Sequence, residues 1–133
     1  LYRTLVQRRP TAAFAVEAAD VLAADTRERA GLIALAQAQL AVNRANGVQP
    51  EPSDVVLEAT YGDPATALRM AESLWSGQKG VYAADAYAVA LHAVGRDVEA
   101  LRFAERALAL GTTTPALREH RDEIRAALTG GAA

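Results

Sequence analysis

Cysteine is absent from this sequence of 133 residues. The chain therefore has no disulfide framework, no thiol nucleophile and no thiolate ligand for a metal. Aromatic residues are scarce as well, with one Trp, four Tyr and two Phe. The β-branched residues are too scattered to predict strands. These absences exclude cysteine chemistry and argue against a β fold.

Long apolar runs and charge of a single sign are also missing. No stretch approaches the roughly 20 apolar residues that span a membrane. The net charge is −2, with acidic and basic residues interspersed, and no basic stripe indicates nucleic-acid binding. The small basic group Arg3, Arg8 and Arg9 is typical of an exposed helix end. We therefore expect neither a membrane span nor a nucleic-acid partner.

The chain opens at Leu1 within an apolar pattern, without a signal peptide. Leu1, Leu5 and Val6 precede Pro10, which predicts the end of a preceding helix over residues 1–10. We therefore expect a soluble piece of a longer protein, whose compartment stays open because an upstream signal would be missing. An uncovered N-terminal hairpin would also allow the chain to form a homodimer.

Alanine dominates what is present, with 32 residues, and it is the best helix former. Caps, stops and apolar spacing predict helices over residues 12–24, 27–45, 54–60, 64–75, 81–94, 97–110 and 115–128. Thr26, Ser53 and Asp63 are the expected N-caps, the last followed by Pro64. For residues 27–45 the predicted core face is Ala30, Ile33, Ala34, Ala38 and Ala41. The fold class is all-α, with seven to eight helices.

One spacing recurs three times. Asp25, Gly62 and Gly95 are each followed five residues later by Ala, and the three lie 37 and 33 residues apart. These distances bracket the 34-residue period of tetratricopeptide repeats, whose signature is W-x2-L-G-x2-Y, then A-x3-F, then P. Counted from Val81, the relevant places hold Ala84, Tyr87, Ala88, Leu91, Gly95, Ala100, Ala104 and Ala107.

On these residues, 81–114 resemble a tetratricopeptide repeat, although most signature aromatics are replaced and Thr112 stands where Pro is expected. Residues 48–80 resemble a repeat with a short first helix, and 11–46 a degenerate one. The resemblance implies a right-handed α-solenoid of antiparallel hairpins, closed by a capping helix over 115–129. Trp75 is expected to cover the core against the next repeat.

The resemblance also implies a non-catalytic scaffold that binds a peptide or a neighbouring domain in a concave groove. The matching groove places hold Tyr82, Asp85, Val89 and His92 in one repeat, and Val56 and Thr60 in the repeat before it. Family members that grip a terminal carboxylate use Lys and Asn there. Val89 stands at the Asn place and no Lys is available, so we expect no such clamp.

No catalytic or nucleotide-binding motif is present, so we expect no enzyme and no cofactor. Asp85 and His92 lie seven residues apart on one helix. They lack a third metal ligand, which favours a surface pair. His120, within a charged run, is interpreted as a surface residue. The alternative function is a helical accessory or sensor domain of a larger enzyme or regulator that binds a small ligand between hairpins.

Overall fold

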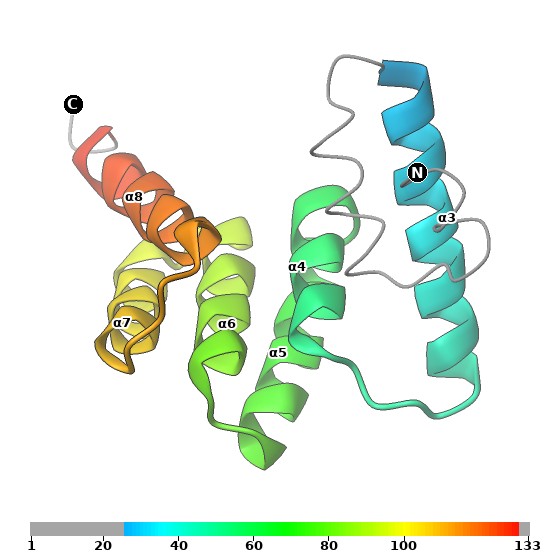
Figure 1. Ribbon diagram of the computed structural model, residues 1–133, viewed down its shortest axis with the longest axis horizontal. Helices are drawn as coiled ribbons and strands as arrows, with labels where there is room; N and C mark the ends of the chain where they lie inside the picture. Colours follow the sequence, from blue (N-terminus) through cyan, green and yellow to red (C-terminus); the bar gives the residue numbers. More distant parts are fainter. Residues whose placement is uncertain (1–25, 131–133) are drawn as a thin grey trace.

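The computed structural model describes residues 26–130, and within this range the chain forms helices and no strand. The all-α prediction is confirmed. Figure 1 shows the helices α3 (Thr26–Ala45), α4 (Pro52–Tyr61), α5 (Pro64–Gly77), α6 (Val81–Ala93), α7 (Asp97–Ala109) and α8 (Pro115–Gly130). The helices predicted over 1–10 and 12–24 lie outside the described residues.

Local chemistry sets several of the helix ends. Asp63 caps α5, where its carboxylate accepts a hydrogen bond from the Thr66 backbone N–H at 3.1 Å and Pro occupies the first turn, as predicted. Gly47, Gly95 and Gly111 follow α3, α6 and α7 with φ of 72°, 84° and 86°. Glycine adopts this left-handed conformation without a steric penalty, so each of these helices stops cleanly.

The N-cap predicted for α4 was wrong. The helix begins at Pro52, before Ser53, and its cap is Glu51. Glu51 and Asp54 form a capping box, in which the Glu51 backbone N–H donates to Asp54 Oδ2 at 2.8 Å. Burial raises the pKa of Asp54, the hydrogen bond from Glu51 lowers it, and the nearby Glu51 carboxylate raises it; the net shift is upward.

Helix α6 is the centre of the structure. It packs against α4, α5, α7 and α8, and α8 also packs on α7. The alternate helices α4, α6 and α8 thus form one continuous row, visible from centre to left in Figure 1. The buried residues of α6 are Ala83, Ala84, Asp85, Ala86, Ala88, Ala90 and Leu91. Small side chains all around a helix let four neighbours approach it closely.

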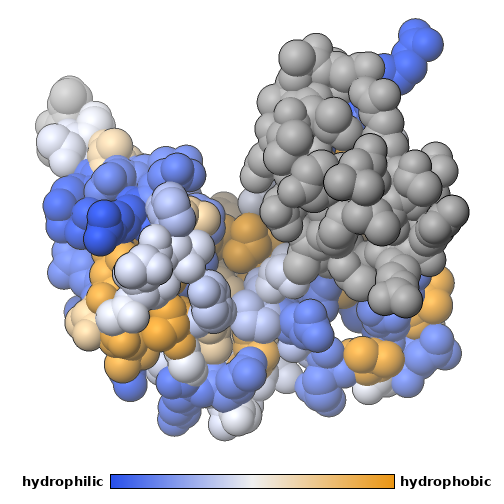
Figure 2. Space-filling view, viewed as in Figure 1, coloured by the Kyte–Doolittle hydropathy of each residue, from blue (hydrophilic) through white to orange (hydrophobic). Residues whose placement is uncertain are grey.

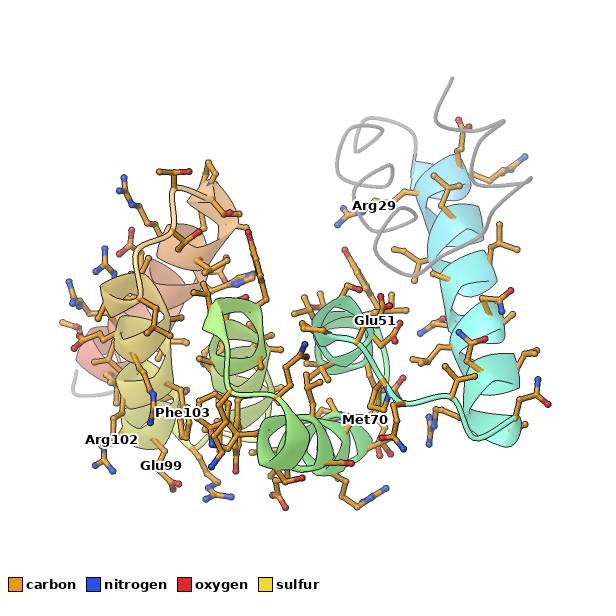
Figure 3. All side chains as sticks on the ribbon, turned by 60° about the horizontal axis from the view of Figure 1, so that its bottom comes forward. Arg29, Glu51, Met70, Glu99, Arg102 and Phe103 are labelled. Atoms are coloured by element: carbon orange, nitrogen blue, oxygen red, sulfur yellow. The ribbon has the colours of Figure 1, made fainter. Side chains whose placement is uncertain are left out.

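Three aromatic side chains link α5, α6 and α7, and we call them the aromatic cluster: Trp75, Tyr87 and Phe103. The ring centroids of Tyr87 and Phe103 lie 4.5 Å apart, and Trp75 meets Phe103 edge-on at 5.3 Å. Phe103 is labelled on α7 in Figure 3. The Arg106 guanidinium lies 5.0 Å from the Trp75 ring centre. The prediction that Trp75 covers the core is confirmed.

The predicted core face of α3 was wrong. Ala30, Ala34, Ala38 and Ala41 are exposed, and Ile33 is partly buried. The buried residues are instead Leu32, Ala36 and Leu40, spaced four apart, in a cluster with residues of α4, α5 and α6. Both faces of the helix are apolar, so side-chain size decides which one packs, because two leucines remove more apolar surface from water than alanines do.

Candidate functional site: a cleft between three alternate helices

A cleft of about 580 Å³ lies where the second half of α4, the second half of α6 and the middle of α8 meet. Its lining residues are Val56, Ala59, Thr60, Tyr61, Val89, His92, Ala93, Glu119, His120, Glu123 and Ile124. Figure 2 shows the surface hollowed beside α8. Four of the six groove residues selected from the sequence, Val56, Thr60, Val89 and His92, therefore border one cavity.

Helical periodicity explains why each helix contributes these residues. Val56 and Thr60 on α4 are four residues apart, as are Glu119 and Glu123 on α8, and Val89 and His92 on α6 are three apart. Residues at such spacings lie on one face of a helix. Because α6 packs against both α4 and α8, these three faces border the same space.

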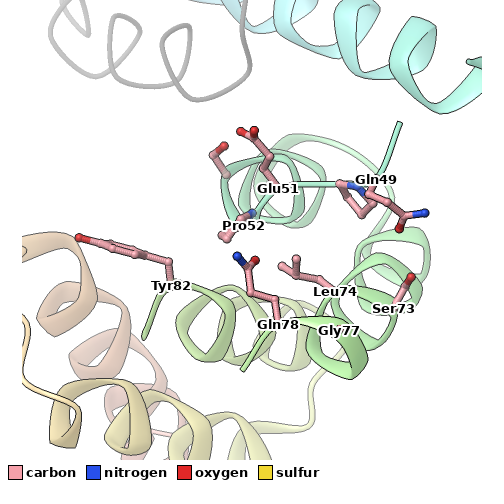
Figure 4. A pocket seen from close by; sticks show the side chains of 10 residues that line it. Gln49, Glu51, Pro52, Ser73, Leu74, Gly77, Gln78 and Tyr82 are labelled. Carbon is pink, nitrogen blue, oxygen red and sulfur yellow. The ribbon is translucent and has the colours of Figure 1, made fainter. Parts of the chain in front are cut away.

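Tyr82 and Asp85 do not line this cleft. Tyr82 lies ten residues before His92, which is about 15 Å along a helix axis. It borders a second cavity of about 660 Å³, formed with the α3–α4 loop and the end of α5 (Figure 4). The Tyr82 hydroxyl forms a hydrogen bond of 2.9 Å with Thr114 Oγ1. Asp85 is buried, with 5% of its surface exposed, and it touches the cleft only through His120.

Two histidines line the cleft, and each is bonded to an aspartate through Nδ1. His120 Nδ1 lies 2.8 Å from Asp85 Oδ1, which ties α8 to α6. His92 Nδ1 lies 2.5 Å from Asp97 Oδ1, across the turn between α6 and α7. The hydrogen bond orients each ring and leaves its Nε2 atom for solvent or a ligand.

These pairs correct two interpretations drawn from the sequence. Asp85 does not pair with His92, because residues seven apart on a helix are separated by about 10 Å along its axis. His120 is not an ordinary surface residue, because only 23% of its side chain is exposed. The packing of α8 on α6 brings together two residues that are 35 positions apart in the chain, and no local pattern contains that information.

The environment of His120 favours its charged form. Burial lowers the pKa of His120, but the hydrogen bond to Asp85 and the charges of Asp85, Glu123 and Glu119 raise it, and the net shift is upward from the ordinary value. The imidazolium of His120 therefore persists to a higher pH than that of a free histidine.

The other charged residues that line the cleft, within the part of the chain that the structure describes, are acidic. Glu119 and Glu123 are exposed, and neither takes part in an ion pair within residues 26–130. No Lys or Arg belongs to the described residues that line the cleft. The floor is apolar, with the partly buried Val56 and Val89 and the buried Ile124. The site is thus an apolar surface bordered by two carboxylates.

Sequence reasoning missed Glu119, His120 and Glu123. The four-residue spacing of the two glutamates indicated a shared face, but the last helix was interpreted as a terminal cap whose charged face meets water. The structure places one part of that charged run beside α6, where it borders the cleft opposite residues of α4. The orientation of α8 depends on buried Leu117 and Ile124, whose partners lie on other helices.

The described residues contain no group of three or more His, Cys, Asp or Glu side chains suited to hold a metal ion. Within residues 26–130, every helix is too short or too polar to cross a membrane. Comparisons of the chain with protein-family models, with curated proteins and with solved structures give no match. The functional interpretation therefore depends on the geometry and charge of the cleft.

Proposed function

We propose that this chain is a non-catalytic scaffold of tetratricopeptide-like helical hairpins that binds a segment of a partner protein in the cleft between α4, α6 and α8. The observation that carries the proposal is that Val56, Thr60, Val89 and His92, selected from the sequence as groove residues, border one cavity with the inner face of α8. Two successive hairpins, α4–α5 and α6–α7, followed by a last helix, support the repeat interpretation.

The form of the cleft supports a peptide as the occupant. Thr60, Glu119 and Glu123 are exposed at its border, while Val56 and Val89 are partly covered on its floor. A bound segment can place apolar side chains on that floor while its backbone stays near solvent, as in other helix-lined peptide grooves. Two histidine Nε2 atoms add polar groups that can pair with the backbone of the segment.

The alternative is a helical accessory or sensor domain that binds a small ligand between hairpins. The observation that favours it is the presence of two oriented imidazoles, those of His92 and His120, in one cleft. Convergent polar groups beside apolar walls are typical of small-molecule sites. Self-association through Leu1, Leu5 and Val6 concerns residues outside the described range and stays a prediction.

A matched pair of variants tests the peptide function. Thr60→Trp fills the cleft with a bulky ring at an exposed position, and Thr113→Trp makes the same change at an exposed residue outside it. Peptides are selected from a random displayed library on the wild-type chain and measured by fluorescence anisotropy. We expect at least a tenfold loss of affinity with Thr60→Trp and less than a twofold change with Thr113→Trp. Equal binding by both variants would exclude the cleft.

A further inference from the structure

We propose that the cleft between α4, α6 and α8 selects a basic segment, one whose Lys or Arg side chain binds between Glu119 and Glu123 while neighbouring apolar side chains rest on Val56 and Val89. This inference rests on the proposed function and specifies its partner by charge. The juxtaposition that carries it is a pair of carboxylates, one helical turn apart and without an ion pair within residues 26–130, beside an apolar floor at which the described residues place no Lys or Arg.

The two glutamates differ from the other acidic residues near them. On α8, Arg121 pairs with Asp122 at 2.7 Å and Arg125 pairs with Glu105 at 3.1 Å. Neither arginine forms an ion pair with Glu119 or Glu123, although both arginines lie on the same helix as these glutamates. Like charges four residues apart on a helix destabilise it. A cation bound between the two carboxylates would remove that repulsion, and this favours a basic occupant over a neutral one.

The histidines do not neutralise these carboxylates. His120 is bonded to Asp85, and His92 is bonded to Asp97, so each imidazole already has a carboxylate partner. When His120 is protonated, its charge is offset by that of Asp85, its hydrogen-bond partner. The charge that a ligand meets is therefore that of the glutamates, and opposite charge at an interface steers association and suppresses wrong partners.

Occupancy by a cation is coupled to the protonation of His120, because a charged imidazole repels a second cation in the same cleft. The titratable groups around His120 are Tyr61 on α4, Asp85 and His92 on α6, and Glu119 and Glu123 on α8. On α7, Asp97 is held by His92 and Glu105 by Arg125. The affinity for a basic segment should accordingly rise with pH as His120 loses its proton.

A defined peptide panel tests the inference on the full chain. The probes are fluorescein-labelled nine-residue peptides of Ala, Val and Ser with one central guest: Arg, Lys, Gln or Glu. At 50 mM salt we expect the Arg and Lys guests to bind about fivefold more tightly than Gln, and Gln more tightly than Glu. The preference should vanish in 1 M NaCl, because salt screens exposed charges. For the Arg guest, affinity should increase between pH 5.5 and 8.5.

Two double variants provide the matched controls. Glu119→Gln with Glu123→Gln should abolish the preference for basic guests and keep the affinity of the Gln guest within about twofold. Glu72→Gln with Glu105→Gln changes the net charge equally outside the cleft and should preserve the preference. If Thr60→Trp weakens binding while the affinity does not depend on the guest's charge, or is highest for the Glu guest, that result would overturn this inference and leave the proposed function standing. Absence of peptide binding, or binding that Thr60→Trp leaves unchanged, would overturn both.

Discussion

The hydrogen bond between His120 and Asp85 gives the most direct test of how α8 is held on α6. Replacing His120 by Leu keeps much of the side-chain volume and removes the partner of the Asp85 carboxylate, whose side chain is only 6% exposed. A buried carboxylate without a partner pays its full desolvation cost. We therefore expect His120→Leu to destabilise the fold well beyond an ordinary surface substitution.

The expected magnitude follows from burial. Breaking a fully buried ion pair costs about 3–5 kcal/mol, and hydrogen bonds to charged groups are worth about 1.5–3 kcal/mol. Because 23% of the His120 side chain reaches solvent, we expect a loss of about 2 kcal/mol in the free energy of unfolding. For a chain of this length that corresponds to a decrease in Tm of roughly 6–10 °C.

Urea denaturation followed by far-UV circular dichroism measures the effect, in a double-mutant cycle with Asp85→Ala. The double variant should cost less than the sum of the two single variants by roughly 1–2 kcal/mol. The control is His92→Leu, which breaks the more exposed pair with Asp97, where 34% and 21% of the two side chains are accessible. That variant should lose less than about 1 kcal/mol.

The destabilisation caused by His120→Leu should depend on pH in a direction that the pKa shift of His120 predicts. The pKa of His120 is raised in the folded chain, so its added stability is fully present below the unfolded pKa of about 6.5. The stability is lost as pH rises through the folded pKa. The destabilisation caused by His120→Leu should therefore be larger at pH 5.5 than at pH 8.5. An effect that grows with pH, or a coupling energy of zero, would refute the reasoning.

Further predictions concern the backbone and the core. Gly95→Ala forces a side chain into φ of 84° and should cost about 1–2 kcal/mol; Gly31→Ala, on the exposed face of α3 with open space around the new Cβ, should instead stabilise by about 0.5–1 kcal/mol. Thermal melts measure both changes in stability. If the two variants shift Tm in the same direction, the backbone argument is wrong. Leu57→Ala, at a fully buried site, should cost about 2–5 kcal/mol in urea denaturation, whereas exposed Leu110→Ala should change stability by less than about 0.5 kcal/mol. Phe103→Leu removes ring contacts of 4.5 and 5.3 Å in the aromatic cluster and should cost about 1–2 kcal/mol, with a changed Trp75 emission spectrum; an unaltered spectrum would argue against those contacts.

Helix positions could be predicted because their signals are local. Asp63 and Pro64 start α5 by satisfying or omitting backbone donors within one turn. Gly95 ends α6 because the chain must adopt a left-handed conformation there. Such effects involve neighbours within about four residues, so the sequence contains all the information they require. The prediction at Ser53 was wrong because Glu51 and Asp54 formed a competing local cap.

The choice of the packed face on α3 was harder. Both the alanine stripe and the Leu32–Leu40 stripe have helical spacing, and periodicity alone does not rank them. The structure buries the leucines because the surface that faces α3, including Val55 and Leu57 of α4, can cover larger side chains. Which face packs is therefore a property of two helices together, and a single-helix pattern does not determine it.

The sequence by itself determined that the described part of this protein is helical and where most of its helices begin and end. Helical spacing also placed Val56 with Thr60, and Val89 with His92, on shared helix faces. Only the tertiary structure decided that α8 lies against α6, that Asp85 pairs with His120 and not with His92, and that Glu119 and Glu123 face the cleft. The physical reason is the distance along the chain over which each interaction acts. Caps and periodicity act within a few residues, whereas the burial of Leu117 and Ile124 depends on partners elsewhere in the chain and carries the charged face of α8 with it.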